Sequence, residues 1–145
     1  MDDKTLARLR KVGHRIIGER HNEHSYGAGY DKVHVVIGVA TRLTYVGVLG
    51  DEHKPTVISF LSRAIAWFNS QGIECGRVVS DNGPSYVSKV FAKACRTLNL
   101  RHIRTRPYTP RTNGKAERLT QTLCREWAYG KPFQNSEQRV RWLPL

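Results

Sequence analysis

A run of three consecutive β-branched residues, 35–37, limits how this chain can fold more than any other feature. It lies in the first of two β-rich segments, 33–39 and 43–49, and a short turn near Thr41 and Arg42 separates the two. This arrangement predicts a β-hairpin. A strand with apolar residues at consecutive positions is buried on both faces, so the run also predicts a sheet that other elements cover from two sides.

Residues 53–72 predict the clearest helix of the chain. Pro55 suits its first turn, and Gly72 suits its C-terminal stop. One face of this helix is apolar, and we expect it to be buried as core without a chemical role. The residues of that face recur at spacings of three and four: Val57, Phe60, Leu61, Ala64, Ile65 and Phe68.

Shorter elements follow this helix. We expect a strand at 77–80, a helix at 88–98, a short strand at 100–104, a long helix at 113–129 and a further helix near 136–142. A hairpin combined with βα units of this kind predicts an α/β fold, with a mixed central sheet and helices on both sides of it.

The chain carries 24 lysine and arginine residues against 12 aspartate and glutamate residues, which gives a formal net charge of +12. Its 145 residues suit one domain. The excess of positive charge predicts a polyanionic partner, with nucleic acid as the first candidate and an anionic membrane surface as the alternative. No apolar run is long enough to span a bilayer and the first residues do not resemble a signal peptide, so we expect a cytoplasmic protein without a membrane partner.

The cysteines and histidines do not predict a zinc site. The three cysteines are odd in number and have no paired spacing, so we expect reduced thiols. They are Cys75, Cys95 and Cys124. Four histidines of the N-terminal part have no cysteine pair beside them, and we expect them to be exposed to solvent or to contact phosphates. They are His14, His21, His24 and His34.

Asp81 lies between a predicted strand and a predicted turn. It follows the predicted strand at 77–80 and precedes Asn82-Gly83, which is a strong turn signal. Functional sites in α/β folds collect at the carboxyl ends of strands, which makes Asp81 a candidate site residue. The alternative is an Asx-turn residue that only stabilises the turn, and this is the commoner role for an aspartate in such a position.

Residues 106–118 form a basic segment in which two prolines hold the backbone out of a helix before a new helix begins. Thr112 or Asn113 can cap that helix. Glu117 is the only acidic residue between positions 101 and 118, where six lysines and arginines lie. A lone carboxylate in such surroundings either balances charge or faces a metal ion while the cations face phosphates, and the segment alone leaves both interpretations open.

Three features taken together resemble the integrase core of DDE transposases and retroviral integrases. They are the motif Ser80-Asp81-Asn82-Gly83, the 36 positions from Asp81 to Glu117, and the helix start Asn113-Gly114-x-x-Glu117. Residues 103–118 are most similar to a block of bacterial insertion-sequence transposases, and the resemblance is clearest over 33–127. It implies a ribonuclease-H-like fold and a catalytic triad of two aspartates and a glutamate.

The resemblance also assigns the first acid of that triad. Related transposases carry it in a first strand, followed by a pattern similar to the Asp-x-Lys-x-Leu-x-Arg that begins at position 2, which registers Asp2 as the catalytic residue and Asp3 as the fallback. Composition alone favours a basic arm or a short helix for residues 1–11. Relatives extend beyond both ends of this chain, so we expect the N-terminal strand and the C-terminal helix of the domain to be incomplete.

The resemblance implies that Asp2, Asp81 and Glu117 bind Mg²⁺ or Mn²⁺. Two such ions, about 4 Å apart, stabilise charge on the attacking and leaving oxygens when a phosphodiester is cleaved, and oxygen ligands suit them. Water would cleave a DNA 3′ end, and the freed hydroxyl would then attack target DNA. The expected partners are transposon ends and target DNA, bound by a homo-oligomer of the chain. The expected DNA-binding residues are Arg106, Arg111, Asn113, Lys115 and Arg118.

Two other functions stay open. A truncated, non-catalytic DNA-binding fragment would keep the fold without a working metal site, and an incomplete first strand favours it. A ribonuclease-H-type nuclease that cuts RNA in hybrids would share the metal chemistry. The spacing of Asp81 and Glu117 and the basic segment at 107–118 argue against the nuclease.

Overall fold

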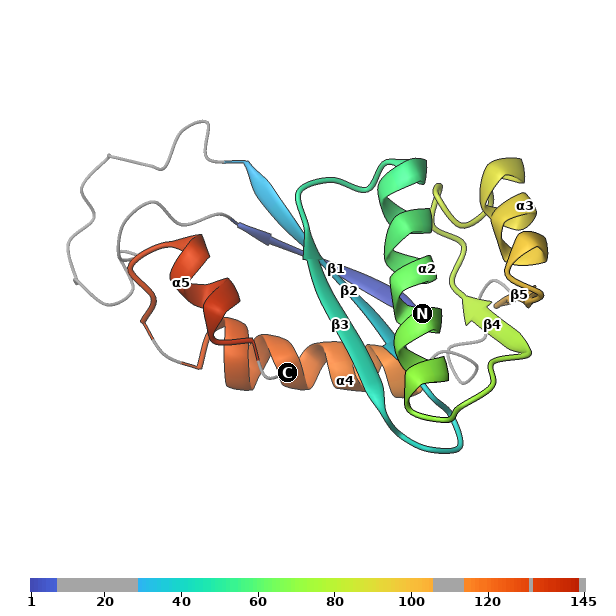
Figure 1. The fold of residues 1–145 in the computed structure, drawn as a ribbon. Coiled ribbons are helices and arrows are strands. Elements are labelled where there is room, and N and C mark those ends of the chain that lie inside the picture. The colour runs from blue at the N-terminus through green and yellow to red at the C-terminus, as the bar shows by residue number, and fades with distance from the viewer. Residues whose placement is uncertain (8–28, 106–113, 131, 144–145) are drawn as a thin grey trace.

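The computed structural model describes residues 1–7, 29–105, 114–130 and 132–143, with the backbone alone for Asp2 and Ala7. Figure 1 shows three strands at the start of the described chain, then helices and strands that alternate from α2 to α4. In chain order the elements are β1 (Asp2–Ala7), β2 (Tyr30–Ile37), β3 (Thr44–Leu49), α2 (Lys54–Ser70), β4 (Arg77–Ser80), α3 (Lys89–Thr97), β5 (Arg101–Arg104), α4 (Gly114–Leu123), the π-helical turn η2 (Cys124–Ala128) and α5 (Ser136–Arg141).

The predicted hairpin is confirmed as β2 and β3, which pair antiparallel. β2 begins at Tyr30, earlier than its apolar run suggests, because its first residues pair with β1. Arg42 supplies the backbone reversal of the turn with a φ of 62°. The strand assignment of the first residues is also confirmed, since β1 pairs antiparallel with β2, whereas the helix or arm that composition favours is wrong for Asp2–Ala7.

The predicted single mixed sheet is split in its hydrogen bonding. Over the described ranges, β1, β2 and β3 form one antiparallel sheet and β4 and β5 form a separate parallel pair. The ammonium group of Met1 donates a hydrogen bond to the carbonyl oxygen of Val79, at 2.7 Å, and so links the edge of the first sheet to β4.

Alternate residues of β2 face two different cores. Val36 packs in a core with Phe60 and the rest of the apolar face of α2. Val33 and Val35 pack in a second core with Trp127 and the apolar residues of α4 and η2. Figure 1 shows α2 and α4 crossing the three-stranded sheet. The prediction of a sheet covered from two sides is therefore confirmed.

The apolar face of α2 is confirmed in full. All six residues predicted to be core are buried, Pro55 lies in the first turn, and Gly72 follows the helix with a φ of 74°. The α3 helix is confirmed with Ser88 as its N-cap, because the Ser88 hydroxyl accepts a hydrogen bond from the backbone N–H of Phe91.

The predicted helix at 113–129 is found with a change of winding. It is α-helical as far as Leu123 and then continues as the π-helical turn η2. Ala116 and Trp127 of this helix are buried, and Leu119 and Leu123 are half-buried against the core that contains Trp127. In the parts of the chain that are described, every helix is too short or too polar to cross a membrane.

Candidate active site

Asp81 lies directly after the last residue of β4, as the sequence predicts, and its side chain is half-buried. Its Oδ1 accepts a hydrogen bond from the backbone N–H of Gly83, at 3.0 Å. This is the Asx-turn that the alternative interpretation predicts. The two roles are compatible, since the turn engages one carboxylate oxygen and a carboxylate has a second oxygen that can bind a cation.

The turn that carries Asp81 is held against β5. The Asn82 side-chain amide donates to the carbonyl oxygen of Thr105, at 2.8 Å, and the Thr105 N–H donates to the carbonyl oxygen of Ser80, at 2.9 Å. The buried Ser80 hydroxyl lies 2.9 Å from Nε2 of His102. These bonds set the exit direction of the chain from β4, and with it the position of the Asp81 carboxylate.

The backbone of Asp2 lies near this turn. Asp2 is the first residue of β1 and pairs with Val35 of β2. It follows Met1, whose ammonium group is bonded to Val79, and Asp81 is only two residues beyond Val79. The fold therefore brings the backbones of the first two predicted acids together, although the Asp2 side chain lies outside what the structure describes.

Glu117 lies in the first turn of α4 with its side chain exposed. Lys115 of the same turn donates from Nζ to the carbonyl oxygen of Val39, at 3.2 Å, which ties the start of α4 to the segment after β2. Arg118 is exposed beside it. Three further predicted DNA-binding residues lie outside the described residues: Arg106, Arg111 and Asn113.

The described residues hold no ready-made metal centre. Within the placed segments, no three histidine, cysteine, aspartate or glutamate side chains gather closely enough to hold a metal ion. Asp81 and Glu117 supply the hard carboxylate oxygens that Mg²⁺ prefers, so the donor chemistry fits the expected ion. The third expected donor, Asp2, is not among the placed side chains.

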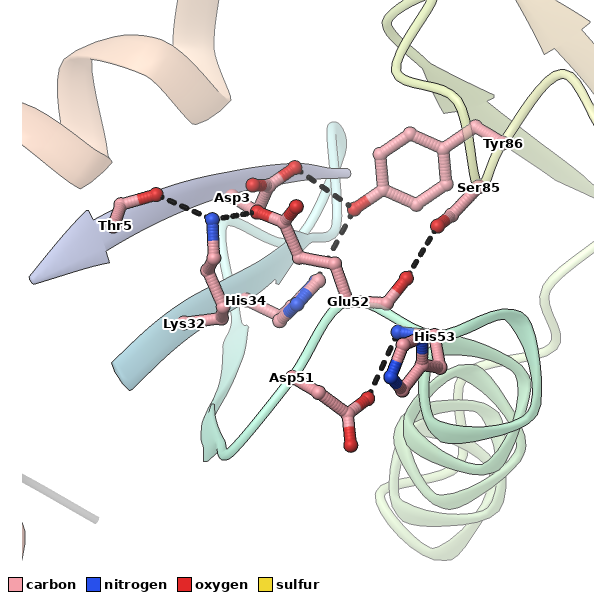
Figure 2. Close-up of polar contacts among 9 residues, drawn as sticks. All are labelled: Asp3, Thr5, Lys32, His34, Asp51, Glu52, His53, Ser85 and Tyr86. Carbon is pink, nitrogen blue, oxygen red and sulfur yellow. Dashed lines mark hydrogen bonds and ion pairs between the residues drawn. The ribbon is translucent and has the colours of Figure 1, made fainter. Parts of the chain in front are cut away.

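A polar cluster that the sequence did not predict joins β1 and β2 to the segments that carry Glu52 and Tyr86 (Figure 2). The ammonium group of Lys32 forms an ion pair with Glu52 and donates to the Thr5 hydroxyl, at 2.6 Å. Lys32 also holds the pKa of Glu52 below its ordinary value. The Tyr86 hydroxyl donates to Oδ1 of Asp3, at 3.4 Å. The fallback acid of the predicted triad is thus part of this cluster.

His34 is buried, which corrects the prediction that it is exposed to solvent or contacts phosphate. Its side chain is 1% exposed, its ring centroid lies 5.4 Å from that of Phe60, and its Nδ1 lies 3.2 Å from the Tyr86 hydroxyl. Burial lowers the pKa of His34 to about 4, so the imidazole is neutral at pH 7. The available signal was its alternation with Val33 and Val35 in β2, which turns it toward α2. The other three histidines lie outside the described residues.

Comparison with known proteins identifies the family. Residues 23–110 match the integrase core domain, and residues 98–143 match a second family description of the integrase core domain. The chain belongs to the integrase core domain family, which is the coarser part of what the sequence resemblance predicts. The finer expectation of a bacterial insertion-sequence origin stays a prediction.

Two curated relatives illustrate how far this similarity extends. The Pol-related polyprotein of the mouse intracisternal A-particle is 30% identical over 92 residues, which are 63% of this chain and 10% of that protein. The retrovirus-related Pol polyprotein from transposon TNT 1-94 of Nicotiana tabacum is 42% identical over 52 residues, which are 36% of this chain and 4% of that protein. The chain therefore spans a tenth or less of the length of these relatives.

Solved structures support the fold. A chain of the simian T-cell lymphotropic virus intasome superposes with a TM-score of 0.62 at 27% identity, over 84% of this chain and 40% of that chain. The catalytic core domain of BIV integrase superposes with a TM-score of 0.56 at 21% identity, over 68% of this chain and 62% of that chain. The predicted ribonuclease-H-like α/β fold is confirmed.

Proposed function

We propose that this chain is the catalytic core of a DDE transposase or integrase, which cleaves DNA at a 3′ end and joins the freed hydroxyl to target DNA. The observation that carries the proposal is the closeness of Asp81, at the end of β4, to the backbone of Asp2, in a chain of the integrase core family. Asp2, Asp81 and Glu117 are the proposed catalytic residues.

The backbone register of β1 supports Asp2 as the first acid. Asp3 is already engaged by the Tyr86 hydroxyl group on the α2 side of the sheet. The backbone of Asp2 pairs with Val35 of β2, which packs in the core that α4 covers, and α4 carries Glu117. This placement supports Asp2 and Glu117 as members of one site.

The three carboxylates would hold Mg²⁺ or Mn²⁺, which when bound stabilises negative charge on the attacking and leaving oxygens of a phosphodiester. The residues of this chain would orient that site. The Asx-turn of Asp81 and the bond from Asn82 to Thr105 fix one carboxylate. The hydrogen bond from Lys115 to Val39 fixes the first turn of α4, which carries the Glu117 carboxylate.

DNA binding is proposed for the basic side of the same site. Lys115 and Arg118 are exposed on the first turns of α4, and the chain has a net charge of +12. Cations at such positions neutralise phosphates without reading sequence. We extend this role to Arg106, Arg111 and Asn113. The proposed partners are transposon ends and target DNA, bound by a homo-oligomer in the cytoplasm. The intasome in which the viral relative was solved supports the assembly of this domain on DNA.

A second candidate is a DNA-binding domain without catalytic activity. The observation that favours it is the absence of a ready-made group of three metal-binding side chains among the placed residues. Such a domain would bind DNA through the same cations, with a strong dependence on salt.

The test is a strand-transfer assay with Mg²⁺ or Mn²⁺ on Asp81→Asn and Glu117→Gln. Each change keeps the shape of the side chain and removes its charge, so we expect the transfer rate to fall by about a hundredfold or more while the fold is retained. Glu126→Gln is the matched control, because Glu126 is an exposed glutamate of η2, farther along the same helical segment. An unchanged strand-transfer rate in both Asp81→Asn and Glu117→Gln would contradict the proposal. Salt-sensitive DNA binding by a wild-type chain without metal-dependent transfer would establish the second candidate.

A further inference from the structure

We propose that Tyr86 is a positioning residue for Asp81, because its hydroxyl group bridges His34 and Asp3 and so fastens the Asp81 turn to strands β1 and β2. The inference deepens the proposed function and rests on it for the role of Asp81. It assigns to Tyr86 no contact with DNA or metal.

The backbone connects Tyr86 to Asp81 within one turn. The N–H of Tyr86 donates to the carbonyl oxygen of Gly83, at 3.0 Å, and the N–H of Gly83 donates to Oδ1 of Asp81, also at 3.0 Å. A shift of Tyr86 is therefore transmitted through two hydrogen bonds to the carboxylate. Asp81 and Tyr86 thus belong to one hydrogen-bonded turn.

The Tyr86 ring is held in the core. It is 2% exposed and meets the ring of Phe91 edge-on, with the centroids 5.4 Å apart and an interplanar angle of 70°. The packing of the ring leaves the hydroxyl group at one location. A phenylalanine could fill the same space, so the packing alone does not explain the hydroxyl group.

The hydroxyl group meets two strands at one rung of the sheet. Asp3 of β1 and His34 of β2 are direct partners in the antiparallel register, and the Tyr86 oxygen lies 3.4 Å from Oδ1 of Asp3 and 3.2 Å from Nδ1 of His34. Figure 2 shows the three side chains converging from β1, β2 and the segment after Asp81. The hydroxyl group thus joins the Asp81 turn to the strand that carries Asp2.

One assignment of protons satisfies both hydrogen bonds of the Tyr86 hydroxyl group. A tyrosine hydroxyl has one proton, and donating it to the Asp3 carboxylate leaves its oxygen to accept from Nδ1–H of His34. A neutral imidazole with its proton on Nδ1 has a bare Nε2, and Nε2 of His34 is buried without a hydrogen-bond partner in the described parts of the chain. Burial keeps this imidazole neutral, since the pKa of His34 is lowered to about 4.

The first measurement is hydrogen exchange of the metal-free chain, resolved for the segment 81–87, in Tyr86→Phe and Tyr45→Phe. Both variants lose one oxygen atom from a ring of the α2-side core. The ring centroid of Tyr45 lies 5.5 Å from that of Phe60, and the Tyr45 hydroxyl group is not part of the bridge. We expect exchange in 81–87 to become about tenfold faster in Tyr86→Phe, since a buried hydrogen bond is lost, and to stay unchanged in Tyr45→Phe. His34→Phe removes the hydrogen bond between His34 and the Tyr86 hydroxyl group from the histidine side. It should therefore also speed exchange in 81–87.

The second measurement is the Mn²⁺ concentration that gives half-maximal strand transfer. A displaced Asp81 should raise this concentration severalfold in Tyr86→Phe, with excess Mn²⁺ restoring part of the rate, whereas a loss of folded protein alone would lower the rate at every concentration. Unchanged exchange in 81–87 together with an unchanged Mn²⁺ requirement would overturn the inference. A wild-type chain without transfer activity would overturn the proposed function instead, and the exchange comparison would still decide the role of Tyr86.

Discussion

Arg139 of α5 and Asp31 of β2 form an ion pair between side chains 108 positions apart, with 3.2 Å between the guanidinium Nη2 and the carboxylate Oδ2. Their side chains are only 1% and 10% exposed. The carbonyl oxygen of Arg139 also accepts a hydrogen bond from Nε1 of Trp127, at 2.8 Å. These two contacts fasten α5 to the side of the sheet that α4 covers.

Asp31→Asn should lower the free energy of unfolding by about 3 kcal/mol, because it leaves the buried guanidinium group of Arg139 without the charge of its Asp31 partner. Urea denaturation at pH 7 measures this. The control is Glu137→Gln, which breaks an ion pair of Glu137 with Arg141 whose side chains are 74% and 75% exposed. That change should cost less than about 0.5 kcal/mol. Equal losses in the two variants would contradict the view that burial gives the Asp31 pair its importance.

Gly47→Ala should destabilise the fold by about 1–3 kcal/mol through overpacking. A Cβ atom at position 47 would lie 2.7 Å from Cε2 and 2.9 Å from Cδ2 of Phe60, the ring that also packs on His34. Thermal unfolding measures the change. Gly76→Ala is the control, because a Cβ there meets no atom within 4 Å. A Gly47→Ala protein as stable as this control would mean that Phe60 moves aside without cost.

Stability should fall as the pH is lowered from about 6.5 to about 4, in part because of His34. Its pKa is lowered from 6.5 to about 4 in the folded chain, so the unfolded chain binds more protons in this window. Above pH 6.5 His34 therefore does not lower the free energy of unfolding. Toward pH 4 its protonation on unfolding lowers that free energy by roughly 3 kcal/mol. Denaturation curves across this range measure it.

His34→Gln removes this titration and should flatten the dependence of the unfolding free energy on pH between 6.5 and 4. A smaller slope of the same sign should remain, because burial also lowers the pKa of His102. An identical slope in wild type and His34→Gln would show that His34 does not change its protonation on unfolding.

Arg118→Gln should weaken DNA binding by a similar factor for all sequences and should reduce the slope of log affinity against log salt concentration by about 1. Arg63→Gln is the matched control, since Arg63 is an exposed arginine of α2, on the other side of the sheet, where Nη1 donates to the Ser59 hydroxyl. Fluorescence anisotropy with duplex DNA over a salt series gives both slopes. Equal slopes of log affinity against log salt concentration for the two variants would show that Arg118 of α4 is not part of the DNA-binding surface.

Several elements could be predicted closely because their signals are local. The six core residues of α2 recur with the period of a helix, and each is buried. The strand predicted at 77–80 is found as Arg77–Ser80, and the Asp-Asn-Gly signal after it is a turn that places Asp81 at the strand end. In each case the residues that form the element are neighbours in the chain, so the pattern of side chains contains the information.

The polar cluster of Figure 2 could not be predicted in this way. Asp3, His34, Glu52 and Tyr86 belong to different elements and meet through the register of β1 on β2 and the packing of Tyr86. The misassigned exposure of His34 has the same origin. A polar residue in an apolar strand is buried or exposed according to what covers its side of the sheet.

By itself, the sequence determined the order of strands and helices from β2 onward, the buried face of α2, the excess of positive charge and the position of Asp81 at a strand end. Only the tertiary structure decided that Asp2 lies near Asp81, that His34 is a neutral buried base bonded to Tyr86, and that Arg139 is paired with Asp31. The physical reason is distance along the chain. Periodicity and turn chemistry act between near neighbours, whereas a side chain's burial, its pKa and its ion-pair partner depend on residues brought to it by folding.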